Sequence, residues 1–139
     1  YHQEWDRYQL YRFQQAMAAF NAGHDRRGMD LHALELTALP DKKVFAQAMQ
    51  GRRIAFLYAY CWPNFQYDAP EQVPAVERCR DGVVVLTGLT PGFYQVEWWD
   101  PCTGQIVSTS QLQATGPRTT IQLPEFAQDI AAKLIRAEV

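Results

Sequence analysis

The sequence predicts a mainly β fold: an antiparallel β-sandwich of about eight strands, Ig-like or jelly-roll-like, with one N-terminal α-helix. Three observations predict this class. Short runs of alternating apolar residues recur along the chain, with turn residues between them at the spacing of roughly 8–12 residues that is typical of sandwiches. Residues 82–112 form three such runs joined by two short turns. After its first arginine, the run 53–61 is apolar at every position.

The middle run of residues 82–112 carries the densest aromatic cluster in the sequence. Side chains of a strand point alternately to its two faces, so Tyr94, Val96 and Trp98 are expected in the core. The polar residues between them are expected to face solvent. Trp99 shares that outer face, where a large aromatic side chain is unusual.

Both turns beside this run have residues that suit a tight turn. Residues 90–92 are Thr-Pro-Gly, which predicts a type II turn because proline fixes φ and glycine accepts a positive φ. Residues 100–104 begin with Asp100, which can accept backbone N–H bonds, and end with Gly104, which suits a left-handed bulge. Two alternating runs around such a turn predict a β-hairpin.

Residues 4–22 are predicted to form the helix, and Gly23 is a suitable C-terminal stop. Apolar residues at spacings of three and four give one stripe along it. These residues are Leu10, Phe13, Met17 and Phe20. Trp5, Tyr8 and Tyr11 widen the aromatic surface beyond that stripe. Either the helix packs on its own sandwich, or it belongs to or docks on a larger body outside this chain.

The remaining strands follow from shorter patterns. The run 43–49 also contains helix-favouring residues, and the turn-like residues behind it favour a strand. The last run fits a strand or a short helix equally. The expected strands beside the central three are 31–39, 43–49, 53–61, 118–123 and 129–136. The long proline-containing loop 62–80 is of the length that is usually functional or interfacial.

The doubly apolar run 53–61 needs cover on both faces. The outer face of a sandwich strand is ordinarily polar, so another element is expected on this one. The N-terminal helix is the only candidate in the chain with a spare apolar stripe. We expect residues 1–30 to be helix and linker, and residues 31–139 to be the sandwich domain.

Composition excludes several classes of partner. A net charge of −2 and a pI of about 5.9 argue against a nucleic-acid surface or a polybasic membrane anchor. No run reaches the roughly 20 apolar residues of a bilayer span. The chain starts with Tyr1 rather than Met, so we expect it to be processed or cut from something longer. A bridge between Cys61 and Cys79 is one option, which would leave Cys102 unpaired.

No catalytic, metal or cofactor motif is present in the sequence. Glu35 and Glu97 are the pair that could in principle act in glycoside hydrolysis, but both are predicted on solvent faces without a cleft between them. We therefore expect no catalytic residue, no metal site and no cofactor in this chain.

Exposed aromatic residues are the remaining functional candidates. Trp62, Phe65, Tyr67 and Trp99 could form a platform on which sugar rings stack, or they could pack against a neighbouring domain. Of these two interpretations, we favour packing against a neighbouring domain.

Residues 88–107, GLTPGFYQVEWWDPCTGQIV, carry a family resemblance. They resemble the turn-rich motif in the C-terminal β-sandwich of bacterial (β/α)₈-barrel glycoside hydrolases of the cellulase and mannanase type, some of which carry a collagen-binding-domain label. Residues 123–136 are similar to the last strand of those sandwiches, and residues 44–60 to one of their hairpins. Cys102 departs from the motif, whose turn commonly has a larger or basic residue there.

The resemblance implies an accessory domain packed on a catalytic barrel, with residues 4–30 similar to the last barrel helix and its exit. It implies that the barrel is the partner of this domain and that polysaccharide is a further possible partner. It also implies that the isolated domain can self-associate. Trp5, Tyr8 and Tyr11 would then pack on the barrel. No catalytic residue of the family transfers to this chain. An extracellular or periplasmic location is favoured slightly over others.

Overall fold

The computed structural model describes residues 11–39, 44–61 and 78–138. It confirms a mainly β fold with one helix and eight antiparallel strands in these ranges. The elements are α2 (Tyr11–Asn21), β1 (His32–Leu39), β2 (Val44–Gln50), β3 (Ile54–Cys61), β4 (Val83–Thr87), β5 (Gly92–Asp100), β6 (Gln105–Ala114), β7 (Arg118–Gln122) and β8 (Asp129–Arg136). Both ambiguous runs, β2 and β8, are strands.

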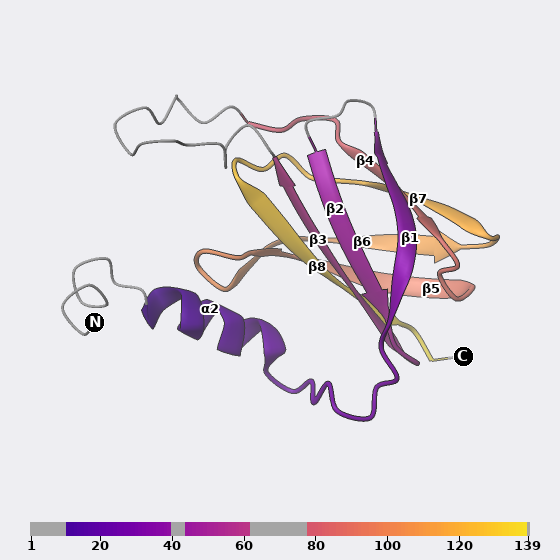
Figure 1. The fold of residues 1–139 in the computed structure, drawn as a ribbon, viewed down its shortest axis with the longest axis horizontal. Coiled ribbons are helices and arrows are strands. Elements are labelled where there is room, and N and C mark those ends of the chain that lie inside the picture. Colours follow the sequence, from indigo (N-terminus) through magenta and orange to yellow (C-terminus); the bar gives the residue numbers. More distant parts are fainter. Residues whose placement is uncertain (1–10, 40–43, 62–77, 139) are drawn as a thin grey trace.

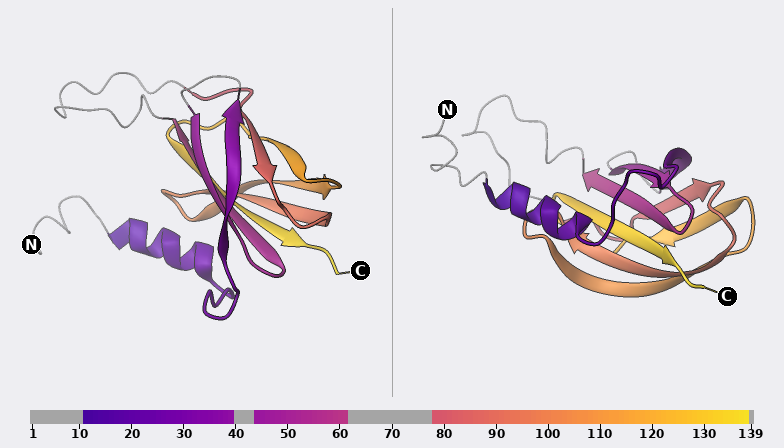
Figure 2. Two further views of the ribbon diagram at one scale, coloured as in Figure 1. Left: turned by 45° about the vertical axis from the view of Figure 1, so that its right-hand side comes forward. Right: turned by 90° about the horizontal axis from the view of Figure 1, so that it is seen from below.

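The strands form one sheet in the order β6-β5-β8-β3-β2-β1-β4-β7, which curls until it is nearly closed (Figures 1 and 2). The core lies inside this curled sheet. Tyr94, Val96 and Trp98 are buried there, as their alternation predicts. Leu57 of β3 and Leu134 of β8 pack into the same cluster.

The expected hairpin at residues 100–104 is confirmed, since β5 pairs with β6 along its whole length. Asp100 accepts a hydrogen bond from the backbone N–H of Cys102 at 2.8 Å through Oδ1. Gly104 has a φ of 66°, the left-handed conformation that glycine adopts without steric cost. The register shifts between Trp98 and Trp99, which marks a β-bulge.

The type II turn predicted at residues 90–92 is wrong. Gly92 has a φ of 152°, whereas a type II turn requires about +80° at that position. The chain crosses here from β4, which pairs with β1 and β7, to β5, which pairs with β6 and β8. The buried amide of Gln50 holds this crossing, because its Oε1 accepts the N–H of Thr90 at 2.7 Å and its Nε2 donates to the carbonyl of Gly88 at 3.3 Å.

The helix ends at Asn21, and Gly23 beyond it has a φ of 76°, so the predicted stop is confirmed. The predicted stripe is only partly the buried face. Ala16 is the buried residue of α2, whereas Phe13 and Met17 are exposed. The reason is a close approach of small residues: a Cβ on Gly104 would lie 2.5 Å from the Cα of Ala16. Residues 4–10 of the predicted helix lie outside the described residues.

Candidate interaction surface

The register of four adjacent strands defines the outer face of the sheet beneath α2. Directly opposite residues of antiparallel strands share a face, so the pairings place side chains of β2, β3, β8 and β5 in rows. These rows are Phe45, Tyr60 and Asp129; Gln47, Tyr58, Ala131 and Trp99; and Met49, Phe56, Lys133 and Glu97.

Helix α2 covers one part of this outer face. The ring of Phe20 lies 5.9 Å from that of Phe56 and 5.5 Å, edge-on, from that of Trp99. Phe56 is thereby only 8% exposed. The inward face of β3 is buried as well, including Ala55 and Ala59. Strand β3 is therefore covered on both faces at this end, and the helix supplies the cover that the sequence required.

A buried cation joins the helix to the sheet. The ammonium of Lys133 lies 4.3 Å from the centre of the Trp99 ring and 5.0 Å from that of Phe20. Lys133 is 3% exposed, and burial lowers its pKa below the ordinary value. Glu97, directly opposite in the next strand, accepts the indole N–H of Trp99 at 3.1 Å. Cation–π contacts of this kind are strongest when desolvated, so these residues fix the C-terminal end of α2.

Beyond the area where α2 covers the sheet, the helix and the outer face carry further large apolar side chains, and all of these except the half-buried Tyr60 are exposed. We name this area the α2–β3 surface; it consists of Phe13, Met17, Phe45, Met49, Tyr58 and Tyr60. Met17 is 67% exposed and Phe13 53%. The rings of Phe45 and Tyr60 stack at 5.7 Å, and those of Tyr58 and Tyr60 lie 5.8 Å apart. The helix and two strands thus present one continuous aromatic and methionine-rich area.

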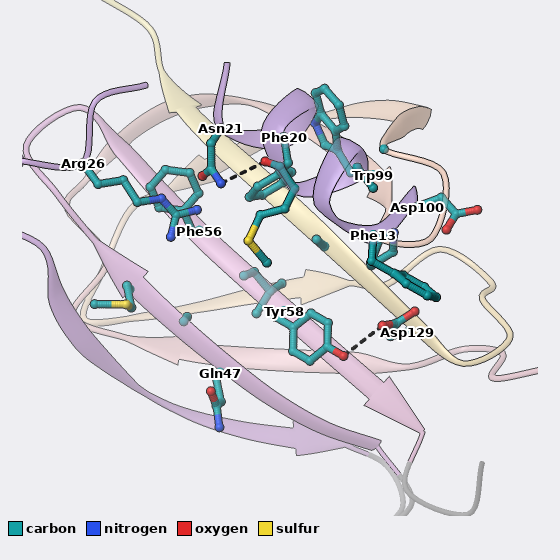
Figure 3. A pocket seen from close by; sticks show the side chains of 18 residues that line it. Phe13, Phe20, Asn21, Arg26, Gln47, Phe56, Tyr58, Trp99, Asp100 and Asp129 are labelled. Carbon is teal, nitrogen blue, oxygen red and sulfur yellow. Dashed lines mark hydrogen bonds between the residues drawn. The ribbon is translucent and has the colours of Figure 1, made fainter. Parts of the chain in front are cut away.

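A groove of about 530 Å³ runs between α2 and the sheet within this surface. Figure 3 shows Phe13 and Tyr58 on its two sides, with Asn21 and Arg26 at one end and Asp100 and Asp129 at the other. There Tyr58 donates a hydrogen bond to Oδ2 of Asp129 at 2.9 Å. Burial raises the pKa of Asp129 and of Tyr58, and the hydrogen bond partly offsets the shift at Asp129. The groove is therefore mainly apolar, with polar groups at both ends.

The sequence-predicted site residues fall in three places. Trp99 lies on the outer face as expected, half-buried beneath Phe20 and Lys133. Tyr11 is exposed at the first described turn of α2. Both proposed roles remain predictions. The other candidates, Trp5, Tyr8, Trp62, Phe65 and Tyr67, lie outside the described residues.

Sequence reasoning missed part of the α2–β3 surface. Phe45 and Met49 were not singled out, because β2 alone fits a helix or a strand. The signal that identifies them is their register against β3, which places both opposite aromatic residues. Asp129 was likewise missed, since only the pairing of β8 with β3 brings it beside Tyr58.

The sheet does not place Glu35 and Glu97 on neighbouring strands. Glu35 of β1 and Glu97 of β5 are separated by β8, β3 and β2 in the sheet. No group of three or more His, Cys, Asp or Glu in the described part could hold a metal ion. No described helix is long and apolar enough to cross a membrane.

Comparison with known protein families and with curated proteins finds no match. Among solved structures, the chain is distantly similar to parts of two glycoside hydrolases. One is α-L-fucosidase isoenzyme 2 from Paenibacillus thiaminolyticus, with 12% identity, a TM-score of 0.47 and coverage of 74% of this chain and 15% of that one. The other is a GH30 endoxylanase from Clostridium papyrosolvens C71, with 16% identity, a TM-score of 0.49 and coverage of 90% and 28%. The chain thus spans less than a third of either.

Proposed function

We propose that this chain is a non-catalytic accessory β-sandwich of a glycoside hydrolase, which packs on a catalytic (β/α)₈ barrel through the α2–β3 surface and stabilises it. The observation that carries the proposal is the outer face of β2 and β3, which stays apolar beyond the area that α2 covers. The outer face of a sandwich ordinarily carries polar side chains. An apolar surface with exposed Met17 and Phe13 favours a partner protein.

The composition of the surface also supports a protein partner. Aromatic and methionine residues are enriched at interfaces, and charged residues are depleted at their centres. The three rows place no charged side chain on β2 or β3; the charged residues of these rows, Asp129, Lys133 and Glu97, lie on β8 and β5. Met17 and Met49 adapt to irregular partner surfaces because their side chains are unbranched and flexible.

The position of α2 supports a partner on the N-terminal side. The helix forms one wall of the groove (Figure 3), so a domain joined to the chain through α2 would be held beside the α2–β3 surface. The resemblance of residues 88–107 to barrel-associated sandwiches indicates that this domain is a (β/α)₈ barrel. Under this proposal, residues 1–30 connect the barrel to the sandwich of residues 31–139.

The test measures binding of this chain to the (β/α)₈ glycoside hydrolase barrel encoded on the same polypeptide or in the adjacent gene. We expect association by sedimentation, a higher Tm of the barrel, and protection of α2 and β3 from hydrogen exchange. Replacing Met17 and Met49 together by Lys should weaken association at least about tenfold, because two ammonium groups would have to lose water at the interface.

A matched control replaces two exposed residues away from the surface, Phe93 and Thr120, by Lys. This control should bind as the unchanged chain does, and circular dichroism should show that both variants fold. No barrel on the polypeptide or beside the gene, or equal binding by both variants, would contradict the proposal. So would turnover of an aryl glycoside by the isolated chain. Retention on insoluble polysaccharide that is lost on changing Trp99→Ala would favour a carbohydrate-binding module instead.

A further inference from the structure

Strand β6 (Gln105–Ala114) lies at one end of the sheet order and pairs only with β5 among the described strands. Its other edge therefore presents backbone N–H and C=O groups without a neighbouring strand in the described part of the chain. It is the longest of the eight strands, at ten residues. A long edge strand is a template for pairing with another strand.

The first seven residues of β6, 105–111, are all exposed. Ser108 and Ser110 lie opposite the buried Trp98 and Val96, so they share the core side of the sheet. Ser110 accepts a hydrogen bond from the indole N–H of Trp98 at 3.1 Å, yet both serines are exposed. Only Leu112 and Ala114 reach the core cluster. The N-terminal half of β6 is thus exposed, although it pairs with β5 along one edge.

The two edges of the sheet differ in how they discourage pairing. Proteins usually blunt an open edge with charged residues, proline or a short strand. Strand β7, at the opposite edge, has five residues and begins with Arg118. Strand β6 has no charged residue and no proline, and it exposes Ile106 and Val107. Strand β6 therefore lacks the features that usually prevent an edge strand from pairing with another strand.

We propose that β6 pairs antiparallel with β6 of a second copy of this chain, joining the two sheets across a twofold axis at Thr109. A twofold axis perpendicular to the sheet requires one residue to face its own copy, and Thr109 is the centre of the span 105–113. In this register Ile106 faces Leu112 of the second copy, and the same contact repeats on the other side of the axis. Of the remaining pairs, Gln105 faces Gln113 and Ser108 faces Ser110, whereas Val107 faces Gln111.

A second copy fits β6 better than a charged foreign strand, because β6 complements itself. Apolar cross-strand pairs and hydroxyl–hydroxyl pairs both stabilise antiparallel strands. An uncharged strand brings no like charges together at the axis. The pairing also covers Ile106, which is 47% exposed in the single chain.

The test uses the whole chain in a sedimentation series over a range of concentrations, where we expect a monomer–dimer equilibrium. Changing Thr109→Lys should shift the protein to monomer, because the two ammonium groups would meet at the axis. The fold should survive this change, since Thr109 is exposed and lies opposite Glu97. The control Thr120→Lys on β7 should leave the dimer unchanged.

A covalent test fixes the register. In a Cys102→Ser background, Thr109→Cys places two thiols on the axis, where opposite Cα atoms lie about 4.5–5.5 Å apart, within the range that a disulfide spans. Oxidised glutathione should accept their two electrons and two protons, giving a disulfide-linked dimer and two molecules of reduced glutathione. Thr120→Cys in the same background should stay uncrosslinked. A monomer at every concentration, or equal crosslinking of both variants, would overturn the proposal.

Discussion

At the scale of single residues, Asp129 is the most informative side chain of the candidate surface. It is a half-buried carboxylate that accepts a hydrogen bond from Tyr58, and burial raises its pKa in the folded chain. The folded state therefore binds more protons than the unfolded state between pH 3.8 and the raised pKa. Within that window the free energy of unfolding falls as pH rises.

Replacing Asp129→Asn should remove this pH dependence while keeping an oxygen that accepts the Tyr58 hydroxyl. We expect the variant to be at least as stable as the unchanged chain at neutral pH, with the difference vanishing below pH 3.8. Urea unfolding at a series of pH values measures this. Asp129→Ala is the control that also loses the acceptor. A variant that is less stable at neutral pH than at acid pH would contradict the assignment.

Lys133 shows why an outward-facing residue can be part of the packing. Its position in β8 alternates with the core residues Ala132 and Leu134, so it points away from the core. The rings of Phe20 and Trp99 then bury it. The sequence places it on the outer face, but only the docking of α2 buries it.

At the scale of elements, the position of α2 against the sheet depends on one glycine. Gly104 has a φ of 66°, and a Cβ there would lie 2.5 Å from the Cα of Ala16 and 3.0 Å from its carbonyl oxygen. Both atoms belong to helix backbone, so a side chain at residue 104 can be accommodated only if the helix moves.

We expect Gly104→Ala to cost about 1–2 kcal/mol from the left-handed backbone alone, with a further loss from the displaced helix. Hydrogen exchange should rise in α2 and near Phe56, and fluorescence of Trp99 should shift to the red. The control Gly23→Ala also has a positive φ, but nothing lies within 4 Å of its added Cβ. This control variant should lose stability through backbone strain, but α2 should stay packed on the sheet. Equal exchange in both variants would contradict this role of Gly104.

At the scale of the whole molecule, the two proposed contact areas lie on different elements. The α2–β3 surface uses α2, β2 and β3, whereas the dimer edge uses β6. Strands β5 and β8 separate β6 from β3 in the sheet. Effects of changes at distant sites usually add within about 0.5 kcal/mol.

Thr109→Lys should therefore abolish the dimer and leave barrel binding intact, and the Met17→Lys, Met49→Lys pair should do the reverse. The triple variant should show the sum of the two free-energy changes in sedimentation and in barrel titration. Loss of both interactions from either change alone would show that a single surface serves both.

The sequence by itself determined the fold class, seven of the eight strands, the hairpin at residues 100–104 and the inward set of Tyr94, Val96 and Trp98; its last run fitted a strand or a short helix equally. These are properties of local periodicity and turn chemistry, which act between residues a few positions apart. It also indicated that the outer face of β3 needed cover. The path between β4 and β5 did not follow, because Thr-Pro-Gly suits a turn within a hairpin as well as a crossing, and the buried amide of Gln50 decides between them.

Tertiary structure alone decided which apolar side chains stay exposed. The stripe of α2 is equally apolar at Phe13, Met17 and Phe20, and the contact of Ala16 with the turn at Gly104 turns Phe20 onto the sheet and leaves the other two uncovered. The open edge of β6 is likewise a result of strand order, because no pattern within a strand records which strand lies beside it. The local pattern determines which residues are apolar, and the long-range pairing of the strands determines which of these residues are buried.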